Sequence, residues 1–198
     1  MPITLTWTGH ATWLIDTGKG TLLIDPFFDE CPTASMKARD VACDAILVTH
    51  GHFDHVADLV AIAKWTGAMV YCNWEIAQWL GKHGVQNVQP MNLGGSVAVP
   101  GGRAKMEIAH HSSSLPDGSY GGNPAGWLLD VAVLPIGDLF TMGPDDAVRL
   151  LKPKLALPSH YGTWPRIEQD AIAWARRVEA AGLAAAKAPA VGEPLTIG

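Results

Sequence analysis

The order of hydrophobic and polar positions changes several times along the chain, and each change marks a predicted element. The first part alternates apolar and polar residues in short stretches, which is typical of β-strands with one covered face. Strands are predicted on this basis over residues 3–9, 11–18 and 21–27. Gly18-Lys19-Gly20 supplies a tight turn between the last two. Residues 45–50, AILVTH, form a short apolar run, as expected of a strand covered on both faces.

A helical spacing of apolar residues begins after Asp54 and stops at Gly67. The apolar positions that recur every three or four residues are Val56, Leu59, Val60 and Ala63. Residues 68–72 predict another strand. Asn73 is a residue type that caps helices, and it precedes a second helical pattern over residues 74–84.

The second half of the chain continues with alternating strand-like and helical segments. Strands are predicted over residues 96–100, 104–110, 125–130, 131–137 and 154–160. A short helix follows Gly143-Pro144, and Asp145 and Asp146 lie in its first turn, where the helix dipole favours acidic side chains. A last amphipathic helix carries Ile167, Ile172, Ala175 and Val178, and residues 194–197 form a final edge strand.

Early strands followed by alternating strands and helices predict an α/β layered protein with its sheets buried between helices. The chain has 198 residues, which suits a single domain spanning residues 1–198. No internal repeat and no linker divides it.

Composition narrows the functional classes. Hydrophobic residues make up 48% of the chain, and its net charge is −5, so disorder is not expected. A pI near 5.8 without a basic cluster disfavours nucleic acids and anionic membranes as partners. The sequence shows no signal peptide and no apolar stretch of membrane-spanning length, so a cytoplasmic location is expected. Cys31, Cys43 and Cys72 lack metal-binding spacing and are expected to be reduced thiols.

The densest chemical signal is LVTHGHFDH, residues 47–55. It places His50, His52, Asp54 and His55 directly after a predicted strand. Neutral imidazoles and a carboxylate are the ligands that zinc and similar divalent metals prefer. Gly51 permits a sharp turn between two of the histidines, so both rings can converge on one ion. The adjacent Asp54 and His55 can project toward a second ion.

Two later histidine motifs can complete such a site. His110-His111 and His160 each follow an apolar strand, so both can reach the same sheet edge as residues 50–55. We interpret His111 and His160 as candidate ligands and His110 as a strand residue.

The ordered motifs resemble those of the metallo-β-lactamase superfamily, and more narrowly of the small UPF0173-type metal-dependent hydrolases. The matching stretches are GHATWLID, LLIDPF, HGHFDH, MNLGGS, HHSSS, LPIGDLFTMGP and SHYGTWP, which together run from residue 3 to about residue 170. The resemblance implies a four-layer αββα sandwich with two metal sites between the sheets. It implies a first metal held by His50, His52 and His111, and a second held by Asp54, His55 and His160.

The resemblance also bears on residues outside the ligand set. Asp25 matches an acidic position, and it is expected either to accept a proton from a ligand histidine and fix its tautomer or to cap the turn before Pro26. His10 fits the family pattern, but its sequence context assigns it no chemistry. His83 ends a helix and is expected to be a solvated surface residue.

One family feature is missing from this chain. The superfamily usually carries a further aspartate, in a Gly-Asp turn, that bridges both metals. A strand, that turn and a helix are expected after Asp130, but the chain passes directly into VAVLPIGD. The loss can leave a weak or single-metal catalyst, Asp138 can have taken the vacant role, or the sequence lacks a segment that the natural protein has. Without the shared carboxylate the second metal is expected to bind more weakly.

The function expected is metal-dependent hydrolysis, in which a metal-bound hydroxide attacks an ester, lactone, amide or phosphodiester. Asp54 is the candidate catalytic residue, because it can both bind metal and orient the nucleophile. Zinc is the expected metal, with manganese or iron as alternatives, and the partner is a small-molecule substrate. The alternative is a catalytically impaired member that binds metal and acts as a binding protein. Formation of a homo-oligomer is left open.

Overall fold

The computed structural model describes residues 2–129, 132–138, 141, 143, 145–151 and 153–197. Asp130, Val131 and Pro144, which belong to or border predicted elements, lie outside these residues. The strands are β1 (Ile3–Gly9), β2 (Thr12–Asp16), β3 (Thr21–Ile24), β4 (Ala45–Leu47), β5 (Met69–Asn73), β6 (Val88–Met91), β7 (Ser96–Val99), β8 (Gly102–Ile108), β9 (Ala125–Leu128), β10 (Ala132–Pro135), β11 (Leu155–Ser159), β12 (Ala185–Ala186) and β13 (Pro194–Ile197). The helices are η1 (Ala38–Asp40), α1 (Phe53–Val56), α2 (Leu59–Thr66), α3 (Trp74–Lys82), α4 (Asp146–Leu151), η2 (Pro165–Ile167) and α5 (Ala171–Ala180).

The larger sheet contains seven strands in the order β13-β1-β2-β3-β4-β5-β6. The first three strands pair antiparallel through tight connections, whereas β3 to β6 pair in parallel. Parallel neighbours need crossover connections, which α1 and α2 supply between β4 and β5, and α3 between β5 and β6. Because of this topology, the carboxyl ends of β3 and β4 share one edge with the turn that joins β1 to β2.

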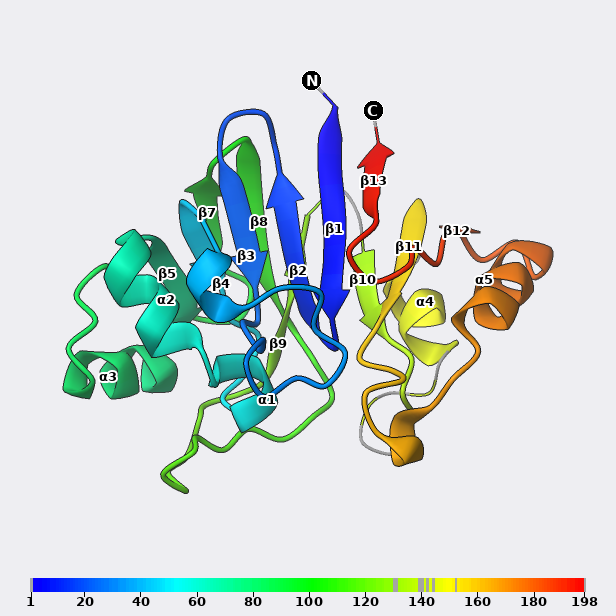
Figure 1. The fold of residues 1–198 in the computed structure, drawn as a ribbon. Helices are drawn as coiled ribbons and strands as arrows, with labels where there is room; N and C mark the ends of the chain where they lie inside the picture. Colours follow the sequence, from blue (N-terminus) through cyan, green and yellow to red (C-terminus); the bar gives the residue numbers. More distant parts are fainter. Residues whose placement is uncertain are drawn as a thin grey trace.

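The opposite layer is divided into two three-stranded sheets, β7-β8-β9 and β10-β11-β12. In the part of the chain that the structure describes, β9 and β10 do not pair with each other. The division falls between Leu128 and Ala132, where the sequence lacks the expected strand and helix. Figure 1 shows α2 and α3 on one side of the strands and α4 and α5 on the other. The fold is therefore the predicted layered sandwich.

Local sequence signals set several element boundaries. Gly67 follows α2 in the left-handed region, with φ of 69°, and ends the helix as predicted. The Asn73 side chain accepts a hydrogen bond from the Ile76 N–H at 2.9 Å, which confirms the predicted cap of α3. The prediction for the last helix was wrong at Ile167, which lies in η2, and at Ile172, which is 59% exposed. Because α5 begins only at Ala171, its buried stripe instead includes Trp174.

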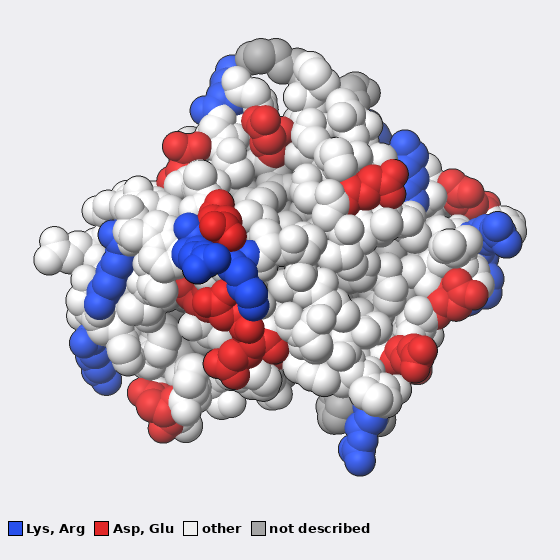
Figure 2. Space-filling model, in the orientation of Figure 1, with Lys and Arg blue, Asp and Glu red and all other residues white. Residues whose placement is uncertain are grey.

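Three apolar clusters hold the layers together. The first lies between the larger sheet and α2 and α3, the second lies between the sheet layers, and the third lies beneath α5. On the face shown in Figure 2, basic and acidic side chains are interspersed rather than gathered by sign. Within the described residues, no helix combines the length and apolar character needed to cross a membrane.

Candidate metal centre

The predicted ligand residues meet at one edge of the sandwich. His50 follows β4, and Asp54 and His55 lie in α1, the first helical turn after that strand. His111 follows β8 and His160 follows β11, so the second layer contributes from both of its sheets. The edge thus collects side chains from strand ends that are far apart in the sequence.

The backbone is strained at this edge. Four described non-glycine residues have positive φ values: His10 (48°), Asp25 (45°), Asp138 (55°) and His160 (55°). Each lies at or just beyond the end of a strand. Strained conformations persist where the surrounding structure enforces them, and they cluster at functional sites.

The first group of ligand-type atoms comes from His50, His52 and His111, whose candidate atoms all lie within 4.8 Å of one another. His50 Nε2 is 3.0 Å from His52 Nδ1. The His111 ring centroid lies 4.6 Å from that of His50 and 5.0 Å from that of His52. The structure therefore brings together the three residues predicted for the first metal.

The tight turn at Gly51 depends on close packing. A Cβ atom at this position would lie 3.1 Å from Leu115 Cδ2 and 3.3 Å from the Ser114 carbonyl oxygen. The Gly51 N–H donates to Ser113 Oγ at 3.1 Å. Ser113 thus fastens the loop after His111 to the histidine turn.

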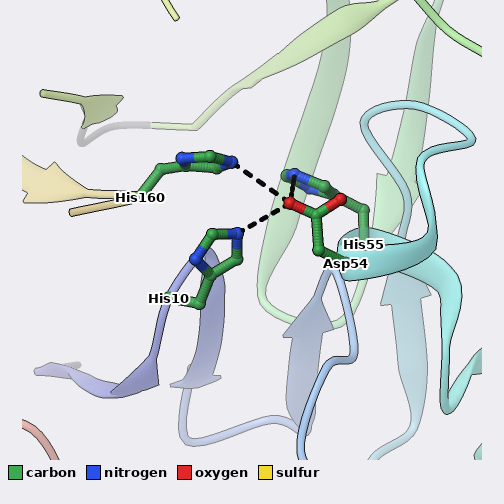
Figure 3. Close-up of side chains that lie close together, drawn as sticks. All are labelled: His10, Asp54, His55 and His160. Atoms are coloured by element: carbon green, nitrogen blue, oxygen red, sulfur yellow. Dashed lines mark hydrogen bonds and ion pairs between the residues drawn. The ribbon is translucent and has the colours of Figure 1, made fainter. Parts of the chain in front are cut away.

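The second group contains Asp54, His55 and His160, as predicted, together with His10. Asp54 Oδ2 lies 3.0 Å from His10 Nε2, 3.5 Å from His160 Nε2 and 3.7 Å from His55 Nε2. Figure 3 shows the three imidazoles arranged around this single oxygen. The two groups are neighbours, because the ring centroids of His50 and His55 are 4.0 Å apart.

Asp25 supports the second group through a hydrogen bond to His55. Its Oδ2 accepts from His55 Nδ1 at 2.7 Å and from Thr49 Oγ1 at 2.6 Å, and its Oδ1 accepts from the Thr49 N–H at 2.8 Å. This contact places the His55 proton on Nδ1 and leaves Nε2 as an acceptor. His55 Nε2 is buried and has no hydrogen-bond partner among the described residues. An orphaned imidazole nitrogen that faces Asp54 fits a metal ligand.

Burial and mutual proximity favour the neutral form of four of the imidazoles. Burial lowers the pKa of His10, His50, His55 and His111, and neighbouring imidazoles lower the pKa of all four further. Neutral imidazole is the form that binds metals.

The two carboxyl groups are affected in opposite directions. Burial raises the pKa of Asp25 to about 7, although hydrogen bonds from Thr49 oppose the rise. Burial also disfavours ionisation of Asp54, but hydrogen bonds from His10 and His160 outweigh it and hold the Asp54 pKa below its usual value. Asp54 is therefore ionised at neutral pH.

Three residues weighed in the sequence analysis lie outside both groups, and two of them, His110 and His83, were not expected to bind metal. His110 is exposed, and His83 ends α3 with its Nδ1 2.9 Å from the Trp79 carbonyl oxygen. Asp138 is exposed and belongs to neither group, so the structure does not place it in the vacant bridging role.

His10 is the residue whose role the sequence did not indicate. A lone histidine in a turn carries little information by itself. The usable signal was its position, because the β1–β2 turn lies at the same edge as the other strand ends.

A cleft of about 660 Å³ opens over both groups. It is lined by His52, Phe53, Asp54, His111, Ser112, Ser114, Leu115, Pro116, His160 and Trp164. None of these described lining residues is Lys or Arg. The cleft is thus a partly apolar space of the size that accepts a small molecule.

Comparison with known proteins gives consistent matches. A sequence model of the metallo-beta-lactamase superfamily matches residues 5–160. The chain is 42% identical to a UPF0173 metal-dependent hydrolase of Thermus thermophilus, over 89% of this chain and 92% of that protein. It is 39% identical to another from Pelotomaculum thermopropionicum, over 98% and 99% of the two chains. Among solved structures it is similar to Igni18, described as a novel metallo hydrolase from the archaeon Ignicoccus hospitalis, with a TM-score of 0.87, 28% identity and coverage of 100% and 99%.

The relatives also bear on the missing segment. The alignment with the Pelotomaculum protein runs over 228 positions, whereas this chain has 198 residues, so that relative contains residues without a counterpart here. The division of the second layer between β9 and β10 agrees with a deletion near residue 130.

Proposed function

Because the chain belongs to the metallo-β-lactamase superfamily, and within it to the UPF0173 metal-dependent hydrolases, we propose that it hydrolyses a small acyl substrate at a pair of metal sites. The observation that carries the proposal is the convergence of two neighbouring ligand groups beneath one cleft. His50, His52 and His111 would hold one ion, and Asp54, His55 and His160 would hold the other.

The donor atoms fit divalent zinc, because imidazole nitrogen and carboxylate oxygen are its common ligands. When bound, such ions lower the pKa of a coordinated water toward neutrality and polarise the bond to be broken. The chain's own contribution is to hold His10, His50, His55 and His111 neutral, to keep Asp54 ionised and to fix the His55 tautomer through Asp25. Asp54 then accepts a hydrogen bond from the attacking water and orients it.

The cleft lining favours an ester, lactone or amide over a phosphodiester. Phe53, Leu115 and Trp164 offer apolar surface, and no described lining residue is a Lys or Arg that could pair with a phosphate. A neutral acyl substrate with an apolar part therefore matches this lining better than an anionic one.

The test is a hydrolysis assay with zinc- or manganese-loaded protein on p-nitrophenyl esters, lactones and bis(p-nitrophenyl) phosphate. We expect ester or lactone hydrolysis that a chelator abolishes. His111→Ala should lower kcat/KM by about 100-fold or more, because it removes a metal ligand. His110→Ala is the matched control, since it alters the adjacent exposed residue and should leave kcat/KM unchanged. Full activity in His111→Ala, or a preference for the phosphodiester, would contradict the proposal.

The divided second layer favours one alternative, a metal-binding protein without catalytic activity. The segment that the family uses to supply a bridging carboxylate has no counterpart near residue 130. Two bound metal ions without hydrolysis of any substrate in the same assay would support this alternative.

A further inference from the structure

His10 lies inside the second ligand group although it lies outside the HGHFDH, HHSSS and SHYGTWP motifs that supply the predicted ligands. Its side chain is fully buried, and its ring centroid lies 4.0 Å from that of His160. Its Nε2 is 3.0 Å from Asp54 Oδ2. The imidazole therefore presents a nitrogen to the same point as Asp54, His55 and His160 (Figure 3).

The distances from Asp54 Oδ2 to the three imidazole nitrogens are close to those in a tetrahedral zinc site, and all four ligand atoms lie within 4.8 Å of one another. Zinc bonds of 2.0–2.1 Å arranged tetrahedrally separate neighbouring ligand atoms by about 3.3 Å. The three imidazole nitrogens lie 3.0, 3.5 and 3.7 Å from Asp54 Oδ2, which brackets that separation. Small side-chain adjustments would place all four atoms around one ion.

The backbone of His10 is held at this place by several contacts. Its carbonyl oxygen accepts hydrogen bonds from Trp7 Nε1 at 2.8 Å, from the His160 N–H at 2.9 Å and from Ser159 Oγ at 3.2 Å. These bonds stabilise the left-handed conformation of His10 and tie its position to that of His160. The two histidines are thus positioned as a unit across the two layers.

The remaining ring nitrogen is also accounted for. His10 Nδ1 lies 2.8 Å from Thr163 Oγ1, and Thr163 is buried. When Nδ1–H donates to this hydroxyl, the lone pair of Nε2 is free to bind an ion. This arrangement parallels the contact between Asp25 and His55.

We propose that His10 is a fourth protein ligand of the Asp54, His55 and His160 site, an inference that rests on the proposed pair of metal sites. Four protein ligands make this site closed, whereas the His50, His52 and His111 site keeps an open position. His10 adds a neutral donor, so it raises the ligand count without replacing the charge of the absent carboxylate. With four protein ligands, this site should bind its ion more tightly than the weak second site that was expected from the sequence.

The test compares zinc affinity and the visible spectrum of cobalt(II)-loaded protein among His10 variants. His10→Gly removes the ring and suits the positive φ, so metal-free stability serves as the folding control. We expect one of two zinc ions to bind about 10–100-fold more weakly, and the cobalt spectrum to change. Added imidazole should restore tight binding of two zinc ions in His10→Gly. Wild-type protein in the same imidazole concentration is the reference, because imidazole can also occupy the open position of the His50, His52 and His111 site.

The variant His10→Gln distinguishes a role of His10 as a metal ligand from a role as a hydrogen-bond donor to Asp54. Its amide can donate to Asp54 but is a poor zinc ligand, so zinc affinity should stay low. Wild-type affinity for both ions in His10→Gln, or no response of His10→Gly to imidazole, would overturn the inference and leave the proposed function intact. Binding of fewer than two ions by the wild type would overturn the proposed pair of sites and the inference with it.

Discussion

At the scale of single residues, Asp25 connects the backbone at Thr49 to the candidate ligand His55. Its carboxyl group accepts from Thr49 and from His55 Nδ1, and it is 2% exposed. A buried acceptor at this position decides which nitrogen of His55 faces the ion. The metal affinity of the second group therefore depends on a residue that does not touch the metal.

Asp25→Asn should weaken zinc binding at the second group by about 10–100-fold, because an amide is a poorer acceptor for the His55 proton. Competition with a chromophoric chelator measures this affinity. Asp44→Asn is the matched control, since the Asp44 carboxylate accepts from the Thr21 N–H at 2.8 Å and is in neither ligand group. Equal affinities in the two variants would show that Asp25 does not set the tautomer.

At this scale the sequence predicted the clustered ligands of residues 50–55 better than it predicted the role of His10. His50, His52, Asp54 and His55 lie within six positions, so their proximity needed no knowledge of the fold. The place of His10 depends on hydrogen bonds to residues about 150 positions away, such as the Ser159 hydroxyl. No local pattern encodes such a contact.

At the scale of elements, Asn73 connects a helix to a loop that bears a ligand. Its Oδ1 caps α3, and its Nδ2 donates to the Gly121 carbonyl at 2.7 Å and the Asn123 carbonyl at 3.2 Å. That loop continues from His111 and is joined back to Ser113 by the Gly121 N–H. One buried amide thus fixes both the start of α3 and the segment after the first ligand group.

Asn73→Ala should lower the free energy of unfolding by about 1–3 kcal/mol, because it removes a cap and leaves buried carbonyl groups without a donor. Urea denaturation of the metal-free protein measures the change. Asn73→Asp retains the cap acceptor but loses the donor, so it should also loosen the loop and weaken zinc binding by His111. An unchanged midpoint in Asn73→Ala would contradict this account.

Element boundaries were predictable where a local residue sets them. Gly67 and Asn73 ended and began helices as their types require. The strand β6 was not predicted, because it contains Pro90, which lacks an N–H for a central ladder. Its edge position in the seven-stranded sheet explains why proline is tolerated there.

At the scale of the whole molecule, the site depends on how the two sheet layers pack against each other. A hollow of about 70 Å³ lies between them near the division, with Leu5, Val99, Leu129 and Val133 among its lining residues. The second layer is therefore packed less fully where the strand is absent. The sequence indicated the deletion through resemblance, but the separation of β9 from β10 is a property of the assembled layers.

The buried imidazoles also link metal binding to the stability of the whole fold. His10, His50 and His55 have pKa values lowered by burial, so the folded state favours their neutral forms. Below pH 6.5, the usual value, the unfolded chain binds more protons at these positions, and stability falls as the pH falls. The pKa of Asp25, raised to about 7, acts in the opposite direction between about pH 4 and pH 7. The opposing effect of this one carboxyl group on the pH dependence of stability does not outweigh the combined effect of the three imidazoles.

We therefore expect the metal-free protein to lose stability as the pH is lowered from 8 to 5.5. Each additional proton bound by the unfolded state contributes a slope of at most about 1.4 kcal/mol per pH unit. Urea denaturation in the presence of a chelator measures the slope. Zinc-loaded protein is the control, because bound metal holds the imidazoles deprotonated and flattens the profile until the ion is displaced. His50→Gln should reduce the slope of the metal-free protein, since it removes one of the imidazoles. A metal-free protein whose stability rises over this range would show that Asp25 dominates the site's proton balance.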